Sequence, residues 1–398
     1  MKIAIVSGIY FPEPGGAQIQ SHNFANKLVE LGHEVDSYIF NPSDIKINDY
    51  NIIVVNKFLS SLIFFFEYYL NIDISFFLEI YFKKIIKEKK YDIWHFNFVN
   101  FKSLIIIIFL KKLNQKIIVT FQGVDIQIDQ NINYGYRLNK KYNKYLLKTL
   151  NKIDLFLNIS KTIENDLRKI EVKKNKIIYL PNTVDTKKIK SIYDLQKNLP
   201  TKELRLITVA RYAEKKKGFD LIPILAQKLL NNNVVFNWTI IGENTNKLFK
   251  NDFIKKNRNL FSIFENINND VEKYFPHSSI VSKYISSDIY VNLARVESFG
   301  ITFIEAMAGG LPVISFDTKG ANEIIINNHN GYLIYSNDMN DFVKKIVDIY
   351  NDKKTLNLTK LNVFKTVEKY DLEIVTKKLI NIYKKINNDI KKIMSTHN

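Results

Sequence analysis

Short apolar runs alternate with longer amphipathic segments along this chain of 398 residues. The runs have the length and the β-branched and aromatic content of buried strands. In the first part of the chain, strands are predicted at residues 2–7, 35–40, 52–55, 92–96, 116–121, 155–159 and 177–180. The alternation then starts again, with strands predicted at residues 204–210, 236–241, 260–264, 289–293, 312–316 and 332–334. This order predicts an α/β fold of two Rossmann-like, doubly wound domains that face a central cleft.

The length of the chain also favours two domains. A polar segment with proline near both ends, at Pro181 and Pro200, separates the two series of strands. We therefore predict a first domain over residues 1–182, an interdomain linker over residues 183–203 and a second domain over residues 204–371.

Composition excludes several kinds of site. The chain has no cysteine, so neither disulfides nor cysteine-bound metals can form, and a reducing compartment such as the cytoplasm is expected. The first apolar run is too short for a signal peptide. The longest aliphatic run, residues 104–110, falls far short of the about 20 residues that span a bilayer. Neither His-Glu-x-x-His nor Asp-x-Asp occurs, so no metal site is expected.

The formal net charge is +18, and only 6 of the 58 basic residues are arginine. Arginine is the preferred reader of bases and phosphates, so this excess of lysine does not favour a nucleic-acid partner. An anionic substrate or an anionic membrane surface is expected instead.

Two segments have features of membrane-surface sequences. Residues 58–82 contain ten Phe or Tyr residues. Near the C-terminus, apolar and lysine side chains fall on opposite faces of a predicted helix, as in a basic amphipathic helix. The apolar positions are Val375, Leu379, Ile382, Ile386, Ile390 and Ile393.

Two glutamates eight positions apart, Glu297 and Glu305, lie around the predicted start of a helix that Gly309 and Gly310 end. Ser298 is the predicted N-cap. The free N–H groups of a helix N-terminus suit an anion. Carboxylates beside such a site suit the neutral hydroxyls of a sugar and a ribose. The alternative is a pair of solvated acids on an ordinary surface helix.

These residues resemble those of retaining nucleotide-sugar glycosyltransferases of the GT-B class, glycosyltransferase family four. The shared features are Glu-x7-Glu, the strand that follows it, and a later Gly-x-x-Glu at residues 320–323. The resemblance extends from Gly15 to Gly331. It implies that the first domain binds the acceptor, that the second binds the nucleotide sugar, and that a C-terminal helix over residues 372–398 packs back on the first domain. This last expectation is the alternative to a membrane-bound helix.

The resemblance also implies an activity. The expected reaction is metal-independent, retaining transfer of a hexosyl group from an NDP-sugar, with UDP the favoured nucleotide and no cofactor. The expected acceptor is a glycan or a lipid-linked glycan of bacterial surface polysaccharide synthesis, reached from the cytoplasm at the inner face of the membrane. A GT-B sugar-nucleotide epimerase and a non-catalytic membrane-surface scaffold are the alternatives.

Residues of the second domain receive roles from the same resemblance. Arg211 and Lys217 follow the strand predicted at 204–210 and are expected to neutralise the leaving diphosphate, although a charge run can also be a solvated face. Glu297 is expected to hold the transferred sugar, and Glu305 the ribose. The backbone of three further residues is expected to bind the donor, and these are Phe299, Gly300 and Ile301.

Loops of the first domain supply the remaining candidates. Gly15 and Gly16, in the loop over residues 10–18, are expected to let backbone N–H groups approach the donor, the alternative being a simple turn. Relatives carry histidine where this chain has Gln122, which can bond a sugar but cannot carry a proton. Asp125 either contacts hydroxyls or caps a helix. His95 is a candidate contact for which a structural role is favoured.

Overall fold

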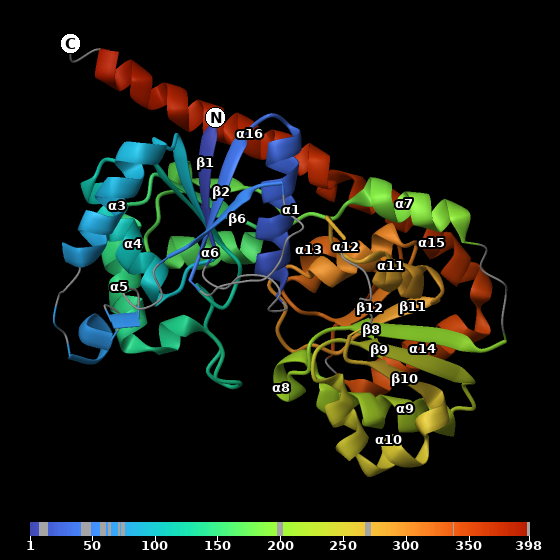
Figure 1. Ribbon diagram of the computed structural model, residues 1–398. Coiled ribbons are helices and arrows are strands. Elements are labelled where there is room, and N and C mark those ends of the chain that lie inside the picture. Colours follow the sequence, from blue (N-terminus) through green and yellow to red (C-terminus); the bar gives the residue numbers. More distant parts are fainter. Residues whose placement is uncertain are drawn as a thin grey trace. The chain divides into compact units, whose positions relative to one another are not determined.

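The computed structural model describes residues 1–7, 15–40, 49–55, 61–62, 65–70, 72, 76–196, 202–266, 272–336 and 338–395. The chain divides into two compact units, one made of Met1–Pro181 with Leu372–Asn398 and the other of Asn182–Asp371. In each unit, helices pack around a parallel sheet (Figure 1).

The first unit is built on a parallel sheet whose strands have the order β3-β2-β1-β4-β5-β6-β7. The strands are β1 (Lys2–Val6), β2 (Glu34–Ile39), β3 (Asn51–Val54), β4 (Ile93–Asn97), β5 (Ile117–Phe121), β6 (Leu155–Asn158) and β7 (Ile177–Tyr179). Every residue of β4 and β5 is buried, because helices cover both faces of the sheet. The helices are α1 (Gly16–Glu30), α3 (Phe76–Lys89), α4 (Phe101–Lys112), α5 (Lys140–Leu150), α6 (Lys161–Lys169) and α16 (Leu372–Ser395), with short turns η1 (Phe66–Leu70), η2 (Tyr136–Leu138) and η3 (Lys174–Lys176).

The C-terminal helix α16 packs on α1 of the first unit. Val375, Leu379 and Tyr383 of α16 are fully buried, so these side chains are not available to a membrane. The Tyr383 hydroxyl lies 2.6 Å from Nδ1 of His95 in β4. The side chains at Ile390 and Ile393 lie outside the described residues.

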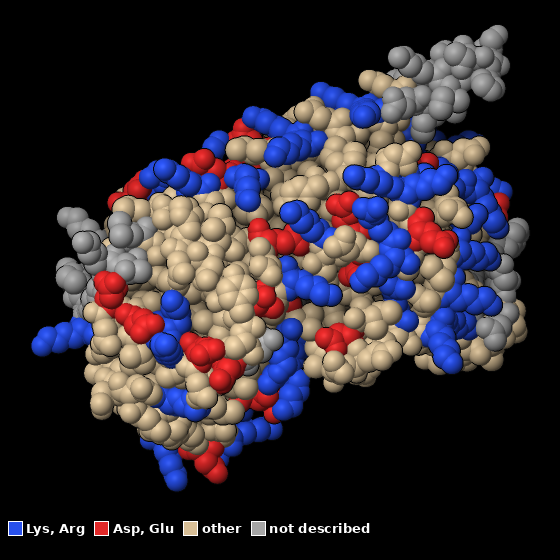
Figure 2. Space-filling model, turned by 180° about the vertical axis from the view of Figure 1, so that it is seen from behind, with Lys and Arg blue, Asp and Glu red and all other residues tan. Residues whose placement is uncertain are grey.

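Lys and Arg side chains are numerous on the face in Figure 2, and Asp and Glu side chains lie among them. Within the described residues, every helix is too short or too polar to span a bilayer.

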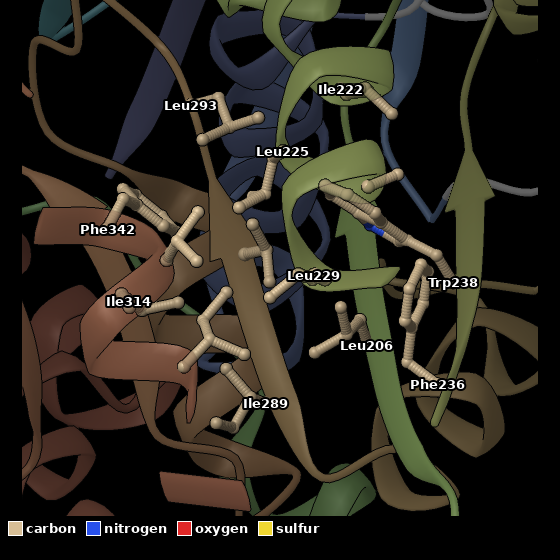
Figure 3. Close-up of a cluster of buried hydrophobic side chains, with 14 of the residues drawn as sticks. Leu206, Ile222, Leu225, Leu229, Phe236, Trp238, Ile289, Leu293, Ile314 and Phe342 are labelled. Carbon is tan, nitrogen blue, oxygen red and sulfur yellow. The ribbon is translucent and has the colours of Figure 1, made fainter. Parts of the chain in front are cut away.

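The second unit repeats the arrangement with the strand order β10-β9-β8-β11-β12-β13. The strands are β8 (Leu204–Val209), β9 (Phe236–Ile241), β10 (Phe261–Phe264), β11 (Ile289–Asn292), β12 (Val313–Phe316) and β13 (Gly331–Ile334). The helices are α7 (Thr186–Leu195), α8 (Glu214–Lys217), α9 (Ile222–Asn231), α10 (Asp252–Lys256), α11 (Ser278–Ile285), α12 (Ile301–Ala308), α13 (Ala321–Ile324), α14 (Met339–Asn351) and α15 (Lys353–Val367), with short turns η4 (Phe219–Leu221), η5 (Thr245–Lys250), η6 (Arg258–Leu260) and η7 (Glu368–Tyr370). In its core, Leu206 of β8 and Ile289 of β11 lie with Leu225 and Leu229 of α9 (Figure 3).

The α/β fold class with two doubly wound, Rossmann-like sheets is confirmed, and each of the thirteen predicted strands ends within one residue of its expected bounds. In both sheets the strand order reverses beside the first strand of the unit, between β1 and β4 and between β8 and β11. Ligands of such sheets bind beyond the carboxyl ends of the strands at this reversal point.

The predicted linker over residues 183–203 requires a correction, because it contains a helix of the second unit. Asp185 caps α7 by accepting the N–H of Lys188 at 3.0 Å. The Lys188 ammonium donates to the carbonyl oxygens of Tyr274 at 2.6 Å and Pro276 at 2.7 Å. The outer face of α7 is polar, so the composition of this segment resembled that of a linker and the helix was not predicted.

A repeated aspartate joins neighbouring strands in both sheets. Asp92, Asp154 and Asp288 each precede a strand and accept an N–H from the strand beside it. The donors are Lys2 at 2.8 Å, Ile117 at 2.8 Å and Arg205 at 3.0 Å, respectively. Each aspartate N–H in turn donates to the carbonyl of the same partner residue. These bonds satisfy backbone groups at the amino edge of the sheet, opposite the edge where ligands bind.

Candidate functional site

The loops after β8 and β11 lie side by side at the reversal point of the second sheet. Gly218, with φ +69, ends α8 in the first of these loops. A Cβ atom at this position would lie 1.9 Å from the carbonyl oxygen of Leu293 in the second loop, so only glycine permits the contact. The N–H of Arg295 donates to the Lys216 carbonyl at 3.0 Å. The two loops therefore form one packed structure.

This packing brings two of the predicted site residues together. Nζ of Lys217 lies 2.8 Å from Oε2 of Glu297, with the two side chains only 22% and 14% exposed. Burial tends to raise the pKa of Glu297, but the charge and hydrogen bond of Lys217 and the charge of Lys216 outweigh it and hold that pKa below its usual value. Glu297 is therefore an ionised carboxylate in a largely buried ion pair.

Positive charge is concentrated in the loop after β8. Burial and the neighbouring charges of Lys217 and Arg211 lower the pKa of Lys216 to about 8, although Glu297 acts in the opposite direction. Arg211 itself is exposed. The loop thus holds several cations that repel one another, which is an arrangement suited to a polyanionic ligand.

A third loop holds the Glu297 backbone in place. The N–H of Gly320, which follows β12, donates to the Glu297 carbonyl at 3.0 Å. A Cβ atom on Gly320 would lie 2.7 Å from that oxygen and 2.7 Å from the N–H nitrogen of Phe299. The glycine of Gly-x-x-Glu is therefore needed for close packing.

Helix α12 begins at Ile301, with Gly300 as its N-cap at φ +93. Ser298 is therefore not the N-cap, because the left-handed Gly300 delays the start of the helix. Gly300 has no side chain with which to cap this end, and the first N–H groups of a helix have no intrahelical acceptor. Phe299 is buried, and its ring lies 5.6 Å from that of Tyr370, in an edge-to-face arrangement.

Glu305 is the fifth residue of α12 and so lies about one turn into the helix. Its side chain is buried, and Oε2 accepts the Tyr284 hydroxyl at 2.9 Å. Burial raises the pKa of Glu305 to about 7, although the Tyr284 hydrogen bond and the Lys188 charge oppose it. Unlike Glu297, this carboxyl group forms no ion pair within the described part of the chain.

In the first unit, Asp125 is fully buried and organises the loop after β5. Its carboxylate accepts the N–H groups of Gln122 at 3.0 Å, Gly123 at 2.9 Å and Val99 at 3.2 Å. Burial raises the pKa of Asp125 to about 7, against the effect of these N–H groups. The geometry favours this structural role over a contact with acceptor hydroxyls.

His95 is also buried and has a partner on each ring nitrogen. Nδ1 lies 2.6 Å from the Tyr383 hydroxyl and Nε2 lies 2.7 Å from the Thr120 hydroxyl. Burial lowers the pKa of His95 to about 3, so the ring is neutral. The structural role already favoured for this residue fits these contacts.

Gln122 belongs to a polar cluster at the reversal point of the first sheet. Its side-chain amide donates to Oδ1 of Asn97 at 2.8 Å, and the Asn97 amide donates to the Ser21 hydroxyl at 2.8 Å. Asn97 and Ser21 were not among the site residues predicted from the sequence. Asn97 lies at the carboxyl end of a predicted strand, and this position could have identified it as a candidate site residue.

Gly15 is the N-cap of α1 and Gly16 is its first residue. The rest of the predicted donor loop, residues 10–14, lies outside the described residues. No cluster of three or more His, Asp or Glu side chains suited to a metal occurs within the described part of the chain.

Comparison with known proteins gives matches over most of the sequence. Residues 190–363 match the family model described as glycosyl transferases group 1, and residues 14–188 match glycosyltransferase family 4. An uncharacterised glycosyltransferase of Methanocaldococcus jannaschii is 27% identical over 364 residues, which are 89% of this chain and 90% of the relative. A poly(ribitol-phosphate) alpha-N-acetylglucosaminyltransferase of Staphylococcus aureus is 27% identical over 249 residues, which are 61% of this chain but 46% of the relative.

The fold is also similar to that of solved structures. The Anabaena protein HepE in complex with UDP has a TM-score of 0.73 and 14% sequence identity, over 97% of this chain and 100% of that chain. At this identity the similarity shows the fold alone.

Proposed function

This chain belongs to glycosyltransferase family 4, with a second half of the glycosyl transferases group 1 type, and from that premise we propose that it transfers a hexosyl group from an NDP-sugar to a glycan hydroxyl with retention of the anomeric configuration. Membership of this family identifies the chain as a glycosyltransferase. The donor, the acceptor, the stereochemistry and the roles of individual residues are the content of the proposal.

The pairing of Lys217 with Glu297, at the end of the sheet where ligands bind, is the observation that supports the proposal most directly. Lys217 and Arg211 would contact the diphosphate and stabilise the negative charge that grows on it as the glycosidic bond breaks, a role that a metal ion has in other enzymes. Glu297 would accept hydrogen bonds from hydroxyls of the transferred sugar. The N–H groups near Phe299, Gly300 and Ile301 would bind the phosphate.

Glu305 would bind the hydroxyls of the nucleotide ribose, since its carboxyl group forms no ion pair within the described part of the chain and lies beside the Tyr284 hydroxyl. UDP is the proposed nucleotide. A protein with a similar fold has been solved in complex with UDP, and this supports the choice.

Retention by a carboxylate nucleophile needs two carboxyl groups about 5 Å apart across the sugar. Glu297 is held instead by Lys217, and Glu305 lies inside the helix. We therefore favour a front-face reaction. In it the acceptor oxygen bonds to the anomeric carbon on the side from which the diphosphate leaves, and the acceptor proton passes to a phosphate oxygen.

The proposed acceptor is a glycan or a lipid-linked glycan of bacterial surface polysaccharide synthesis, with the Staphylococcus aureus relative as support. The enzyme would act in the cytoplasm at the inner face of the membrane. Exposed apolar side chains in the aromatic-rich segment of the first unit support a peripheral contact with anionic lipid. They are Phe65, Tyr69, Leu70, Ile72, Phe77 and Ile80.

A thermal-shift screen of UDP-, GDP- and ADP-sugars identifies the donor, and we expect the UDP-sugars to stabilise the protein most. Turnover of that donor should require an acceptor, and the product should keep the anomeric configuration by proton NMR. An epimerase would convert the donor sugar without an acceptor, and a scaffold would turn over no donor. Either result would refute the proposal.

A further inference from the structure

Helix α8 is too short and too highly charged to hold its own position. It contains four residues, of which three are consecutive lysines. Isolated helices of this length are unstable in water because the cost of nucleation is not recovered. The lysines also repel one another, since the charge of Lys217 adds to burial in lowering the pKa of Lys216. Contacts outside the helix must therefore determine where Lys217 lies.

Arg295, in the loop after β11, makes contacts of this kind. Its guanidinium forms a two-pronged ion pair with Asp220, with Nη1–Oδ1 at 2.8 Å and Nη2–Oδ2 at 2.9 Å. The same Nη1 donates to the Lys215 carbonyl at 2.7 Å, and the Arg295 N–H donates to the Lys216 carbonyl at 3.0 Å. Lys215 closes the group by pairing with Asp220 at 3.1 Å.

These contacts fix both sides of the Lys217–Glu297 pair. Arg295 lies two positions before Glu297 in the same loop, and its guanidinium binds the backbone two residues before Lys217. Asp220 fixes the orientation of the guanidinium. Burial tends to raise the pKa of Asp220, but the hydrogen bonds of Arg295 and Lys215 outweigh this and lower it, so the aspartate is ionised.

We propose that Asp220 and Arg295 are positioning residues that hold the backbone of α8 against the β11 loop, and so set Lys217 at the distance from Glu297 that the proposed transfer requires. The inference rests on the proposed function. Both side chains are partly exposed, Arg295 at 34% and Asp220 at 16%. Partly exposed ion pairs add little stability, so the pair should affect the reaction more than folding.

Two variants separate positioning from simple charge balance. Asp220→Asn keeps the shape but removes the charge that orients Arg295. Arg295→Lys keeps the charge but loses the planar fork and its bond to the Lys215 carbonyl. Both should lower kcat by about tenfold to a hundredfold, as expected when a catalytic group shifts by about 1 Å. Both should leave KM for the donor nearly unchanged, because the groups that bind the nucleotide are intact. The matched control is Asp194→Asn in the exposed Lys190–Asp194 pair of α7.

The link to Lys217 is tested by a double-mutant cycle. In a Lys217→Ala background, Asp220→Asn should lower kcat little further, because its effect acts through a side chain that is already gone. Full additivity would overturn the inference. So would an Arg295→Lys enzyme as active as the Asp194→Asn control.

A crystal structure of Asp220→Asn supplies a readout that does not depend on activity. We expect α8 to move and Nζ of Lys217 to leave hydrogen-bond distance of Glu297. If the wild-type enzyme turned over no NDP-sugar while α8 moved in this variant, the proposed function would fail and the positioning role would stand. An unmoved α8 in the variant would refute the positioning role, whatever the activity.

Discussion

Glu297 and Glu305 lie in one short stretch of chain, yet their surroundings favour opposite protonation states. Lys217 lies 2.8 Å from Glu297 and keeps it ionised. Glu305 has a neutral tyrosine at 2.9 Å, and burial raises its pKa to about 7. The proposed division of labour, with Glu297 on the sugar and Glu305 on the ribose, follows from this difference in partners.

Removal of the exposed Arg211 should lower catalysis far more than stability, whereas removal of Lys217 also leaves the largely buried Glu297 carboxylate without its ion-pair partner. Arg211→Ala and Lys217→Ala should each lower kcat about a hundredfold, because one contact to developing charge contributes about 3 kcal/mol in comparable sites. Steady-state kinetics measure the loss, and Lys190→Ala in the exposed pair of α7 is the control. Near-normal turnover in Arg211→Ala would exclude its assigned role.

The two glutamates should differ in their effect on nucleotide binding. At pH 8, above the Glu305 pKa of about 7, Glu305→Gln should weaken binding of both UDP and the intact donor, because a charge-assisted bond from ribose to the ionised carboxylate becomes a neutral one. Glu297→Gln should leave UDP affinity nearly unchanged and lower turnover of the donor. Calorimetric titration of both variants with UDP distinguishes them, and equal losses of affinity would contradict the assignment.

Glu305 should also make the stability of the free protein depend on pH. Its folded pKa of about 7 lies above the ordinary glutamate value of 4.5. The folded state therefore binds the proton more tightly. Stability from this group is fully present below about pH 4.5 and is lost as pH rises through 7, by up to about 3 kcal/mol. In urea unfolding, Glu305→Gln should become steadily more stable relative to wild type between pH 5 and 8. A constant difference would mean that the carboxyl group is already ionised at pH 5.

At the scale of elements, the site depends on how closely the β8 and β11 loops approach. Gly218 and Gly32 both have left-handed backbone, at φ +69 and φ +81, but a Cβ atom on Gly32 would meet nothing within 4 Å. Substitution of each glycine by alanine therefore distinguishes the cost of backbone strain, which both positions share, from the cost of disturbing the loop packing, which only Gly218 has.

Gly32→Ala should lower stability by roughly 1–2 kcal/mol, because an alanine in the left-handed backbone conformation is strained by that amount. Gly218→Ala should cost about 3 kcal/mol or more, because overpacking against the Leu293 carbonyl is added to the same strain. It should also lower kcat, since the loops would have to separate. Urea unfolding and donor turnover of both variants test this. Equal effects of the two changes would show that the loop contact does not matter.

At the scale of the whole molecule, two compact units each have their own sheet and their own aspartates between strands. Asp154→Ala and Asp288→Ala should each cost about 1–3 kcal/mol by leaving buried N–H groups without an acceptor. The first change should lower the unfolding transition of the first unit, and the second that of the second unit. Calorimetry with and without UDP assigns the transitions, since UDP should raise only the transition of the unit that it binds. Identical shifts of a single transition in both variants would contradict independent units.

The amino-acid sequence by itself determined the elements and their order. Parallel strands buried on both faces are mostly apolar, so runs such as residues 117–121 and 289–292 are visible without any knowledge of their neighbours. The same local chemistry identified the cationic loop after β8 and the glutamates around α12. It did not identify α7, because its polar outer face resembles a linker, and the cleft expected between the domains stays a prediction.

Only the tertiary structure decided what each polar residue does. His95, Asp125 and Glu305 were all candidate ligand contacts, and all three are buried, but the hydrogen bonds of the first two to their own unit favour a structural role for them. Lys217 meets Glu297 across 80 residues of sequence, and Arg295 meets Asp220 across 75. Contacts between residues so distant in sequence depend on which strands become neighbours in the sheet, and no local pattern of residues records that choice.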